Sequence, residues 1–462
     1  MPTSPHPIPT IIISNDSEGT IAYLKKAGNQ QEKLILYRQL HSDRACFWAQ
    51  DHKLVITTRP VPHLAYLHQT LGYKQVQNIS PQQPSLFLSL DILHEPQLIQ
   101  GIVDFAGPNR TLTLIPYANT HEFLQLVASL RSQYGLTILL PESPAPDRLW
   151  LRDYISTKSG FRTLVSQWLR SPSLPPCPPG MIAQRLETAA EMVYWFMQNH
   201  QACIVKIDDG AGGQGQVRFE PHQPPNSNFS PATILETLEK NPFFQGELQD
   251  IAPIVVEQWI QTEPIVSPTI EFYVPPLGQG EPQISYVGNQ LFMDLGQYAG
   301  IIIAQELSAE PWYAALTQAG LCIAQQLQKG GYVGHFDLDA VVDEGNNLFL
   351  LESNPRRTAT TSVHEFAQFH FGPNYLERLV LFADDEMDSG PINNFAQLQA
   401  AIGDLLYSPQ ANPDRPPSGV VVTIASTLET LHRFGCVMIA ASTQDVFALH
   451  QQLQERLRRL VG

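Results

Sequence analysis

The side chains best suited to chemistry lie in residues 334–357, which read GHFDLDAVVDEGNNLFLLESNPRR. Two runs rich in apolar residues, 335–343 and 348–352, are typical of strands, and the polar residues between them are typical of a turn. We therefore predict a hairpin with a four-residue loop, in which Asp343 lies opposite Leu348. This pairing determines which acidic side chains face one another.

Counting outward along the hairpin places Asp339 opposite Glu352 and Asp337 opposite Asn354. Residues two apart on a strand share a face, so the four side chains point the same way. Opposed carboxylates repel one another unless a cation lies between them, and oxygen ligands suit Mg²⁺ or Mn²⁺ held partly by phosphates. We predict that Asp339, Glu352 and Asn354 are metal ligands and leave the role of Asp337 open.

The alternative interpretation of this hairpin is a solvated acidic face. Against it, Val341 and Leu350 are apolar residues of the same predicted face. Arg356, just beyond Asn354, strengthens the metal interpretation, because a phosphate between a cation and a guanidinium group is neutralised from both sides.

A glycine-rich segment at residues 203–219, CIVKIDDGAGGQGQVRF, is the second candidate. It contains G-x-G-x-x-G, but a dinucleotide-binding turn needs a helix at the glycines, and Val217 to Phe219 has the pattern of a strand. A protein kinase is excluded because Lys206 precedes the glycines and no H-R-D or D-F-G motif is present. A P-loop is excluded because no G-K-[ST] ends the glycines.

What remains is a hairpin tip whose N–H groups bind phosphate, with Lys206 entering from the first strand. A simple flexible turn is the alternative, although an ordinary hairpin needs only one or two glycines and each further glycine costs backbone entropy. The candidate phosphate-binding residues of the tip are Gly210, Gly212, Gly213 and Gly215.

The elements that position these groups follow from hydrophobic periodicity. The first 150 residues are expected to form an open α/β layer, in which a helix near Phe123 to Leu130 ends at Gly135. The strands expected there are Lys33–Tyr37, Val76–Ile79, Thr111–Ile115 and Leu136–Leu140. Further along, helices are expected at 161–169, 186–199 and 312–330, strands at 202–207, 217–219, 253–259, 269–274, 419–426 and 436–441, and a basic helix at the end.

Length and charge limit the class of protein. A chain of 462 residues suggests about three domains. The formal net charge of -16, with acids and bases mixed along the chain, argues against a nucleic-acid partner but allows a locally positive small site. We expect no transmembrane helix and no secretion signal. The five scattered cysteines show no metal-ligand spacing, which favours a reducing, cytoplasmic environment.

Taken in order, the motifs resemble those of the ATP-grasp superfamily, and more narrowly the pheganomycin-type peptide ligases. The resemblance extends from about residue 40 to nearly the end of the chain. The stretches that support it are Ser156–Arg162, Val205–Gly210, Glu257–Ile260, Asp339, Glu352–Arg357 with Thr360 and Thr361, Gly419–Ser426 and Phe434–Gly435. The chain departs from these ligases after Arg356, where Arg357, Thr358 and Ala359 stand in place of glycines.

The resemblance implies a role for each matching residue. Lys158 and Lys206 would contact ATP phosphates beneath the glycine loop, and Asp339, Glu352 and Asn354 would bind two magnesium ions. Arg356 would steady the transferred phosphoryl group. Apart from the resemblance, the guanidinium of Arg357 makes it a candidate carboxylate clamp for the substrate. The adenine would form hydrogen bonds with the backbone of a strand edge made of Glu257, Gln258, Trp259 and Ile260. The ribose would be contacted by Glu263 or Glu271.

The implied protein is a cytoplasmic ATP-dependent carboxylate–amine ligase that works through an acyl phosphate on amino acids or peptides. Its expected parts are a pre-ATP-grasp α/β domain (1–150), an ATP-grasp domain (151–375, with a lid at about 200–260) and an α+β extension (376–462). No membrane partner is expected, and a homo-oligomer is possible. The alternatives are an ATP-grasp small-molecule kinase and a nucleotide-binding protein without turnover.

Overall fold

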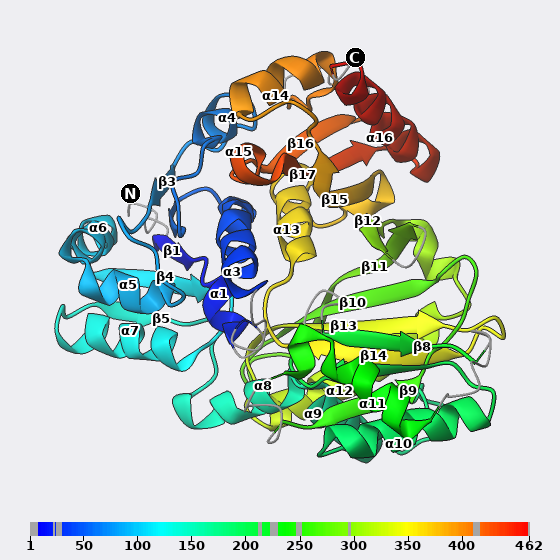
Figure 1. Cartoon of the computed structure of the whole chain (residues 1–462). Coiled ribbons are helices and arrows are strands. Elements are labelled where there is room, and N and C mark those ends of the chain that lie inside the picture. The colour runs from blue at the N-terminus through cyan, green and yellow to red at the C-terminus, as the bar shows by residue number, and fades with distance from the viewer. Residues whose placement is uncertain are drawn as a thin grey trace.

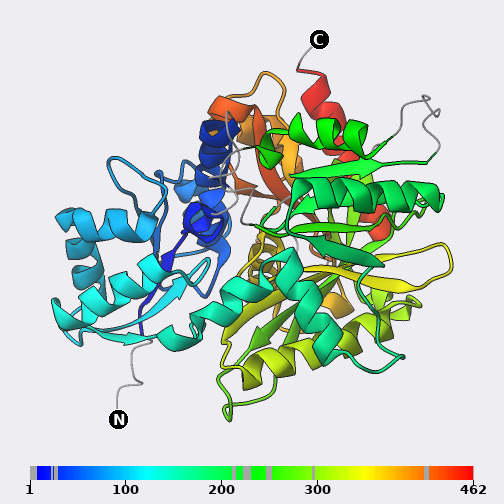
Figure 2. The ribbon, with the colours of Figure 1, turned by 60° about the horizontal axis from the view of Figure 1, so that its bottom comes forward.

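The computed structural model describes residues 8–21, 24, 30–210, 215–221, 230–245, 252–293, 297–409 and 416–460. Its strands form three separate sheets of five, four and eight strands (Figure 1). Figure 2 shows the five-stranded sheet, in blue and cyan, standing to one side of the other two. No helix within the described ranges is long and apolar enough to cross a membrane.

The first sheet is parallel and begins the chain. Apolar residues of its central strands, such as Ile11 and Leu54, are almost fully buried beneath flanking helices. Its strands, in spatial order, are β3 (Val76–Ile79), β2 (Lys53–Ile56), β1 (Thr10–Ile13), β4 (Thr111–Pro116) and β5 (Thr137–Leu139). The flanking helices are α5 (Leu88–His94), α6 (Pro96–Ala106) and α7 (His121–Ser132).

One expected strand in this region is wrong. Residues Lys33 to Tyr37 lie inside the helix α3 (Gln31–Leu40). Leu34 and Ile35 pack against the apolar core of the four-stranded sheet. A short apolar run is compatible with a strand or with a helix, and here it forms the partly buried face of a helix. The strands β1 and β2, which the periodicity did not indicate, supply the centre of the sheet instead.

The second sheet is antiparallel and small. Its strands, in spatial order, are β6 (Gly180–Ala183), β9 (Ile254–Gln258), β7 (Cys203–Ile207) and β8 (Gln216–Phe219). The helices α10 (Leu186–Gln198) and α11 (Pro231–Glu239) pack against each other, and their apolar residues join the core of the sheet. The strands β7, β8 and β9 and the helix α11 fall in the range of about 200–260 for which a lid was expected, whereas β6 and α10 precede it.

The third sheet carries the acidic hairpin at one edge. Its strands, in spatial order, are β14 (Leu348–Asn354), β13 (Gly334–Val342), β10 (Ser267–Val274), β11 (Gln283–Met293), β12 (Gln297–Ile303), β15 (Val380–Asp388), β17 (Arg433–Ala440) and β16 (Gly419–Ile424). The last three come from the expected C-terminal extension, whose strands continue the sheet through the pairing of β12 with β15.

Helices cover this sheet and fix its position. In α12 (Tyr313–Lys329), Leu316, Ile323 and Leu327 are fully buried, and each contributes about 1.5–3 kcal/mol through its burial. The remaining α-helices of the described residues, not all of which contact this sheet, are α1 (Asp16–Gly19), α4 (Leu64–Gln69), α8 (Leu149–Ile155), α9 (Lys158–Trp168), α13 (Ala359–Phe371), α14 (Phe395–Ile402), α15 (Leu428–Leu431) and α16 (Thr443–Arg458).

The predicted register of the acidic hairpin is correct at the site, although the turn is not. Val342, rather than Asp343, pairs with Leu348, so the loop is one residue longer than predicted. A β-bulge at Leu351 restores the count, so that Asp339 pairs with Glu352 and Asp337 with Asn354. The bulge also turns Leu350 into the core, so Leu350 does not share the acidic face as expected.

Candidate active site

The start of α9 brings Lys158 to the acidic hairpin. Thr157 caps this helix by accepting a hydrogen bond from the Gly160 N–H, so Lys158 is its first residue. The Lys158 ammonium lies 3.0 Å from Glu352 Oε2 and donates to the carbonyl oxygen of Gly210 at 2.6 Å. One buried lysine therefore connects the hairpin with the beginning of the glycine loop.

Asp208, which follows β7, locks α9 to the second sheet. Its carboxylate accepts hydrogen bonds from the N–H of Ser159 at 2.7 Å and from the Ser159 hydroxyl at 3.0 Å, and its carbonyl oxygen accepts from the Lys158 N–H at 2.9 Å. Burial raises the Asp208 pKa more than these contacts lower it. No sequence signal singled out Asp208, although it lies in the stretch Val205–Gly210.

Lys206 reaches the same region from β7. Its ammonium pairs with the carboxylate of Glu257 on β9, and Glu257 also pairs with Arg162 of α9 at 3.1 Å. Arg162 can approach so closely because residue 180 is glycine, where a Cβ would lie 2.7 Å from the Arg162 guanidinium. All three charged side chains are mostly buried, which makes the group rigid.

The three predicted metal ligands lie together. Asn354 Nδ2 is 3.1 Å from Asp339 Oδ2 and 3.0 Å from Asp337 Oδ1. Gln290 of β11 donates to the other oxygen of Asp339 at 2.6 Å, and Thr269 of β10 donates to Asp337 at 2.7 Å. Pairing between distant strands supplies Gln290 and Thr269, so no local sequence signal could have revealed them.

The crowded carboxylates titrate differently. Burial, and then the charge of Glu352, raises the pKa of Asp339 to about 7. Burial and Asp339 raise the pKa of Asp337 well above its usual value, which favours its neutral form. Burial also acts to raise the pKa of Glu352, but Lys158 and Lys206 outweigh it and lower the pKa. A cation bound beside Asp339 would offset this repulsion and favour its ionised form.

The donor set fits a magnesium ion that shares its ligands with phosphates. Among the residues that the structure describes, no three histidine, cysteine or carboxylate side chains converge as a complete metal site. Asp339, Glu352 and Asn354 offer two carboxylates and an amide, and Mg²⁺ commonly takes only one or two carboxylates and completes its octahedron with phosphate oxygens and water.

Arg356 faces this group from the end of β14. Its Nη2 donates to Asn354 Oδ1 at 2.9 Å, and its guanidinium carbon lies 5.2 Å from the ring centroid of Tyr117, which follows β4. It forms no ion pair with a carboxylate of the described residues. Arg356 is therefore a cation held beside the predicted metal ligands without a direct ion pair, and its charge acts on the carboxylates of Asp339 and Glu352.

Arg357 points elsewhere. It forms two hydrogen bonds to Glu142, of 2.8 and 2.6 Å, and an ion pair of 2.8 Å with Glu365, and it is 2% exposed. Its guanidinium also stacks over Trp48 at 5.1 Å. These carboxylates occupy the fork that a substrate carboxylate would need, which counts against the expected role of Arg357 as a clamp.

The segment expected to read adenine is in the interior of the second sheet rather than at its edge, because β9 pairs with both β6 and β7. The N–H groups of Gln258 and Trp259 already donate to Pro179 and Ala202. Within the described part of the chain, the N–H of Ile260 has no hydrogen-bond acceptor, so it is the donor left for a ligand.

The two candidate ribose contacts differ. Glu271 is fully buried and pairs with His335 Nδ1 at 2.9 Å beneath the start of α13, which counts against a ribose contact. Glu263 is exposed and follows the Glu257–Ile260 segment. In the glycine loop, Gly210 and Gly215 are described and Gly215 has a φ of +70°, whereas Gly212 and Gly213 lie outside the described residues.

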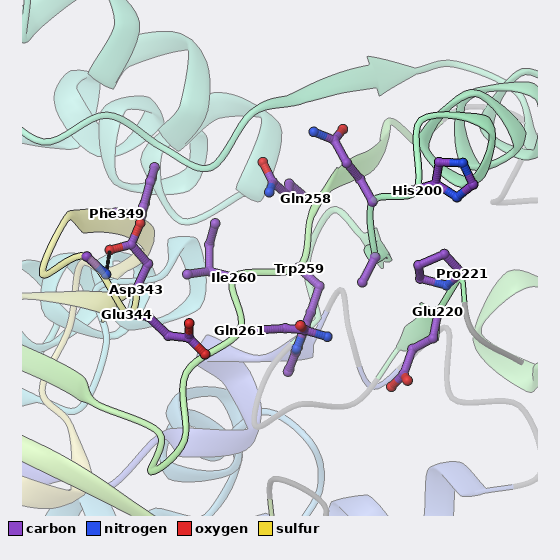
Figure 3. A pocket seen from close by; sticks show the side chains of 13 residues that line it. His200, Glu220, Pro221, Gln258, Trp259, Ile260, Gln261, Asp343, Glu344 and Phe349 are labelled. Atoms are coloured by element: carbon purple, nitrogen blue, oxygen red, sulfur yellow. Dashed lines mark hydrogen bonds between the residues drawn. The ribbon is translucent and has the colours of Figure 1, made fainter.

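A cavity of about 400 Å³ borders the same segment (Figure 3). Gln258, Trp259 and Ile260 line one side, and Glu344 of the hairpin turn and Glu220 after β8 line others. Neither Lys158 nor Lys206 lines it. Since its charged residues are mainly acidic, this cavity suits a triphosphate less well than the surroundings of Lys158 and Lys206 do.

The three sheets, with an antiparallel lid facing an acidic hairpin, have the ATP-grasp fold. Biotin carboxylase from Campylobacter jejuni superposes with a TM-score of 0.57 at 13% identity, covering 97% of this chain and 91% of that one. N5-carboxyaminoimidazole synthetase from Staphylococcus aureus gives a TM-score of 0.53 at 11% identity, covering 98% of each chain.

A biotin carboxylase domain of the Hydrogenobacter thermophilus 2-oxoglutarate carboxylase, solved with MgADP and bicarbonate, gives a TM-score of 0.52 at 12% identity. It covers 95% of this chain and 87% of its own. No family model matches the sequence, and no curated protein does. At these identities the likeness establishes the fold, and the chemistry must be argued from the site.

Proposed function

We propose that the protein is an ATP-dependent carboxylate–amine ligase that forms an amide or peptide bond through an acyl phosphate. The observation that carries the proposal is the convergence of Lys158, Glu352, Asp339, Asn354 and Arg356 at the junction of the lid and the acidic hairpin. Few chemistries require paired carboxylates, buried lysines and an arginine without an ion pair in one place, and phosphoryl transfer is one that does.

The nucleotide would lie between the lid and the eight-stranded sheet. Ile260 N–H would contact the adenine, while Lys158 and Lys206 would bind phosphates under the glycine loop. The ion pair between Lys158 and Glu352 supports this arrangement. With Glu352 holding a cation, the Lys158 ammonium would be available to a phosphate oxygen.

Asp339, Glu352 and Asn354 would hold Mg²⁺, or Mn²⁺, which neutralises phosphate oxygens while the ATP reacts. Asn354 must present its side-chain oxygen to the cation, and that oxygen accepts from Arg356 here. The Asn354 amide and Arg356 therefore would move together when nucleotide and cation bind. The role of Asp337 would be to position Asn354 by accepting a hydrogen bond from its side-chain amide.

The reaction would begin when a substrate carboxylate oxygen attacks the γ-phosphorus of ATP and ADP leaves. An amine then attacks the carbonyl carbon of the acyl phosphate, loses a proton, and expels phosphate. Arg356, beside the transferred group, would stabilise its charge, as positioned cations do in other phosphoryl transfers. We infer amino acids or short peptides as substrates from the peptide-ligase resemblance.

Hydroxylamine trapping tests this proposal against a kinase and against a protein without turnover. The purified protein is incubated with Mg·ATP, hydroxylamine and single acids, and hydroxamate and ADP are measured together. A ligase gives equal amounts of both, because hydroxylamine captures the acyl phosphate. A kinase gives ADP without hydroxamate, and a protein that only binds nucleotide gives neither.

The variant that tests the site is Glu352→Gln. It removes a predicted metal ligand and the partner of Lys158 while nearly preserving the size of the side chain. We expect its hydroxamate formation to fall at least a hundredfold, within the range that a single electrostatic group contributes to catalysis. Undiminished activity in this variant would show that the site assignment is wrong.

A further inference from the structure

A group of three arginines lies where the N-terminal segment meets the active site. Arg38 of α3 and Arg44 of η2 (His41–Phe47) approach the same carboxylate, that of Asp16, at 3.6 and 3.3 Å. Arg356 completes the group, with its guanidinium over the ring of Tyr117. All three arginines act on the pKa of Tyr117, so they surround one phenol at the junction of the domains. Figure 1 shows α1 and α3, in dark blue, between the parallel sheet and the rest of the molecule.

These arginines are not equally compensated. Arg44 has two carboxylate partners, since it also pairs with Asp385 at 2.9 Å. Arg38 lies 3.6 Å from Asp16, which it shares with Arg44. Arg356 makes no ion pair, but its charge acts on the carboxylates of Asp339 and Glu352. Arg38 is therefore the arginine of this group without a close carboxylate partner among the described residues. Mostly buried charges are almost always paired, so the unfilled donors of Arg38 indicate a missing anion.

Neighbouring acids do not supply that anion. Glu386 is engaged by Arg433 and lies 3.3 Å from His41. Asp384 accepts a hydrogen bond from the N–H of Glu386 at 2.8 Å, and its other oxygen lies 3.7 Å from His450 of α16. Both carboxylates are therefore directed to other partners than Arg38.

Asp16 holds Arg38 without occupying its donors. Asp16 is 3% exposed, and its Oδ1 accepts no hydrogen bond from the described residues, because Arg38 Nη1 is too far away at 3.6 Å. The Arg38 side chain is 14% exposed. Its guanidinium fork is thus positioned by charge, partly accessible, and free to bind a planar anion.

We propose that Arg38 binds a second carboxylate of the acid substrate, while Arg356 lies beside the carboxylate that is phosphorylated. The substrate class would be a dicarboxylic acid or an acidic amino acid, and Asp16 would be a positioning residue. This inference rests on the proposed ligase function. The anion is assigned to the acid rather than to ATP because Lys158 and Lys206 already serve the triphosphate, and α3 contributes no predicted nucleotide contact.

The test compares acids of equal length with one or two carboxyl groups, namely succinate, glutarate and adipate against butanoate, pentanoate and hexanoate. Wild-type protein should form hydroxamate from a diacid with a KM at least tenfold lower than from its monoacid. Arg38→Gln should raise the KM for the diacid about tenfold to a hundredfold, the range of a charge-assisted hydrogen bond. Its KM for ATP and its activity on the monoacid should stay within twofold.

Two further variants separate charge from structure. Arg38→Lys keeps the charge but loses the fork, so its KM should lie between those of the wild type and Arg38→Gln. Arg170→Gln removes an exposed arginine whose side chain donates to the carbonyl oxygen of Gln167 and pairs with no carboxylate of this group, and it should leave every constant unchanged. A rise in the KM for ATP instead of the diacid would overturn the proposal, because Arg38 would then bind phosphate. Equal losses with monoacids and diacids would also overturn it.

Calorimetric binding distinguishes failure of this subsite from failure of the ligase proposal. Glutarate is titrated into wild-type and Arg38→Gln protein with magnesium and a non-hydrolysable ATP analogue present. Binding to the wild type that is lost in Arg38→Gln supports the subsite even if no hydroxamate forms with any acid. Equal binding to both proteins, or to neither, contradicts it.

Discussion

Arg356 and Arg357 are neighbours in the chain but belong to different regions of the molecule. Arg356 faces the acidic hairpin, where its nearest partners are an amide oxygen, a backbone carbonyl and an aromatic ring. Arg357 enters a buried network in which Glu142 and Glu365 neutralise it on two sides. Successive residues of extended chain point to opposite sides, so one dipeptide supplies both regions.

The difference between them shows how a residue for chemistry can be told from a residue for structure in a candidate active site. A buried guanidinium with two internal carboxylates has no capacity left for a ligand, and its removal leaves uncompensated charges in the core. A guanidinium that lies beside predicted metal ligands and forms no ion pair of its own can stabilise negative charge on a reacting group. The two arginines are the same type of residue and adjacent in the sequence, and only their partners differ.

The largest expected effect comes from Arg356→Gln. Loss of a preorganised cation beside the transferred phosphoryl group should lower the turnover number about a hundredfold to a thousandfold. The free energy of unfolding should change by less than about 1 kcal/mol, because no internal carboxylate loses its partner. Steady-state ADP release and urea unfolding measure the two quantities. If the variant lost as much free energy of unfolding as it lost in stabilisation of the transition state, the contrast with Arg357 would be contradicted.

Arg357→Gln should behave in the opposite way. It breaks a buried ion pair and should cost about 3–5 kcal/mol of unfolding free energy. Turnover per folded molecule, measured below the unfolding transition, should stay within about threefold because the network touches no predicted substrate atom. If instead the variant were stable and raised the KM for the acid strongly, Arg357 would be the substrate clamp that the sequence suggested.

The smallest expected effect is a change in acid sensitivity. Burial acts to raise the pKa of Glu142, but Arg357 and His335 outweigh it, so the pKa is below the usual value of 4.5. A carboxyl with a lowered pKa stabilises the fold above pH 4.5, and this contribution is lost as the pH falls through the folded-state pKa. Glu142→Gln should therefore flatten the decline in unfolding free energy below pH 4.5. An unchanged pH profile would mean that the network contributes no such linkage.

Much of the acidic hairpin could be predicted from the sequence, because strand periodicity and a turn signal act locally. The pairing of Asp339 with Glu352 was predicted correctly even though the turn was one residue too short, since the bulge at Leu351 cancelled the error. The metal-ligand assignment of Asp339, Glu352 and Asn354 stays a prediction.

Other features depend on contacts between distant parts of the chain and had no local signal. Glu142 reaches Arg357 across 215 residues, and Gln290 reaches Asp339 across 49. The run Lys33 to Tyr37 was wrongly expected to be a strand because five residues cannot show a helical period, and its helix places Arg38 beside Asp16. Tertiary packing decided each of these cases.

Transfer of carboxylate oxygen to phosphate tests the central claim, the acyl phosphate, most directly. An acid accepted in the hydroxylamine assay is labelled with ¹⁸O in its carboxyl group and turned over with Mg·ATP and an amine. If the carboxylate attacks the γ-phosphorus and the amine later expels phosphate, one ¹⁸O atom should appear in the inorganic phosphate formed in each turnover. Phosphate without label, formed at the rate of the product, would contradict the account.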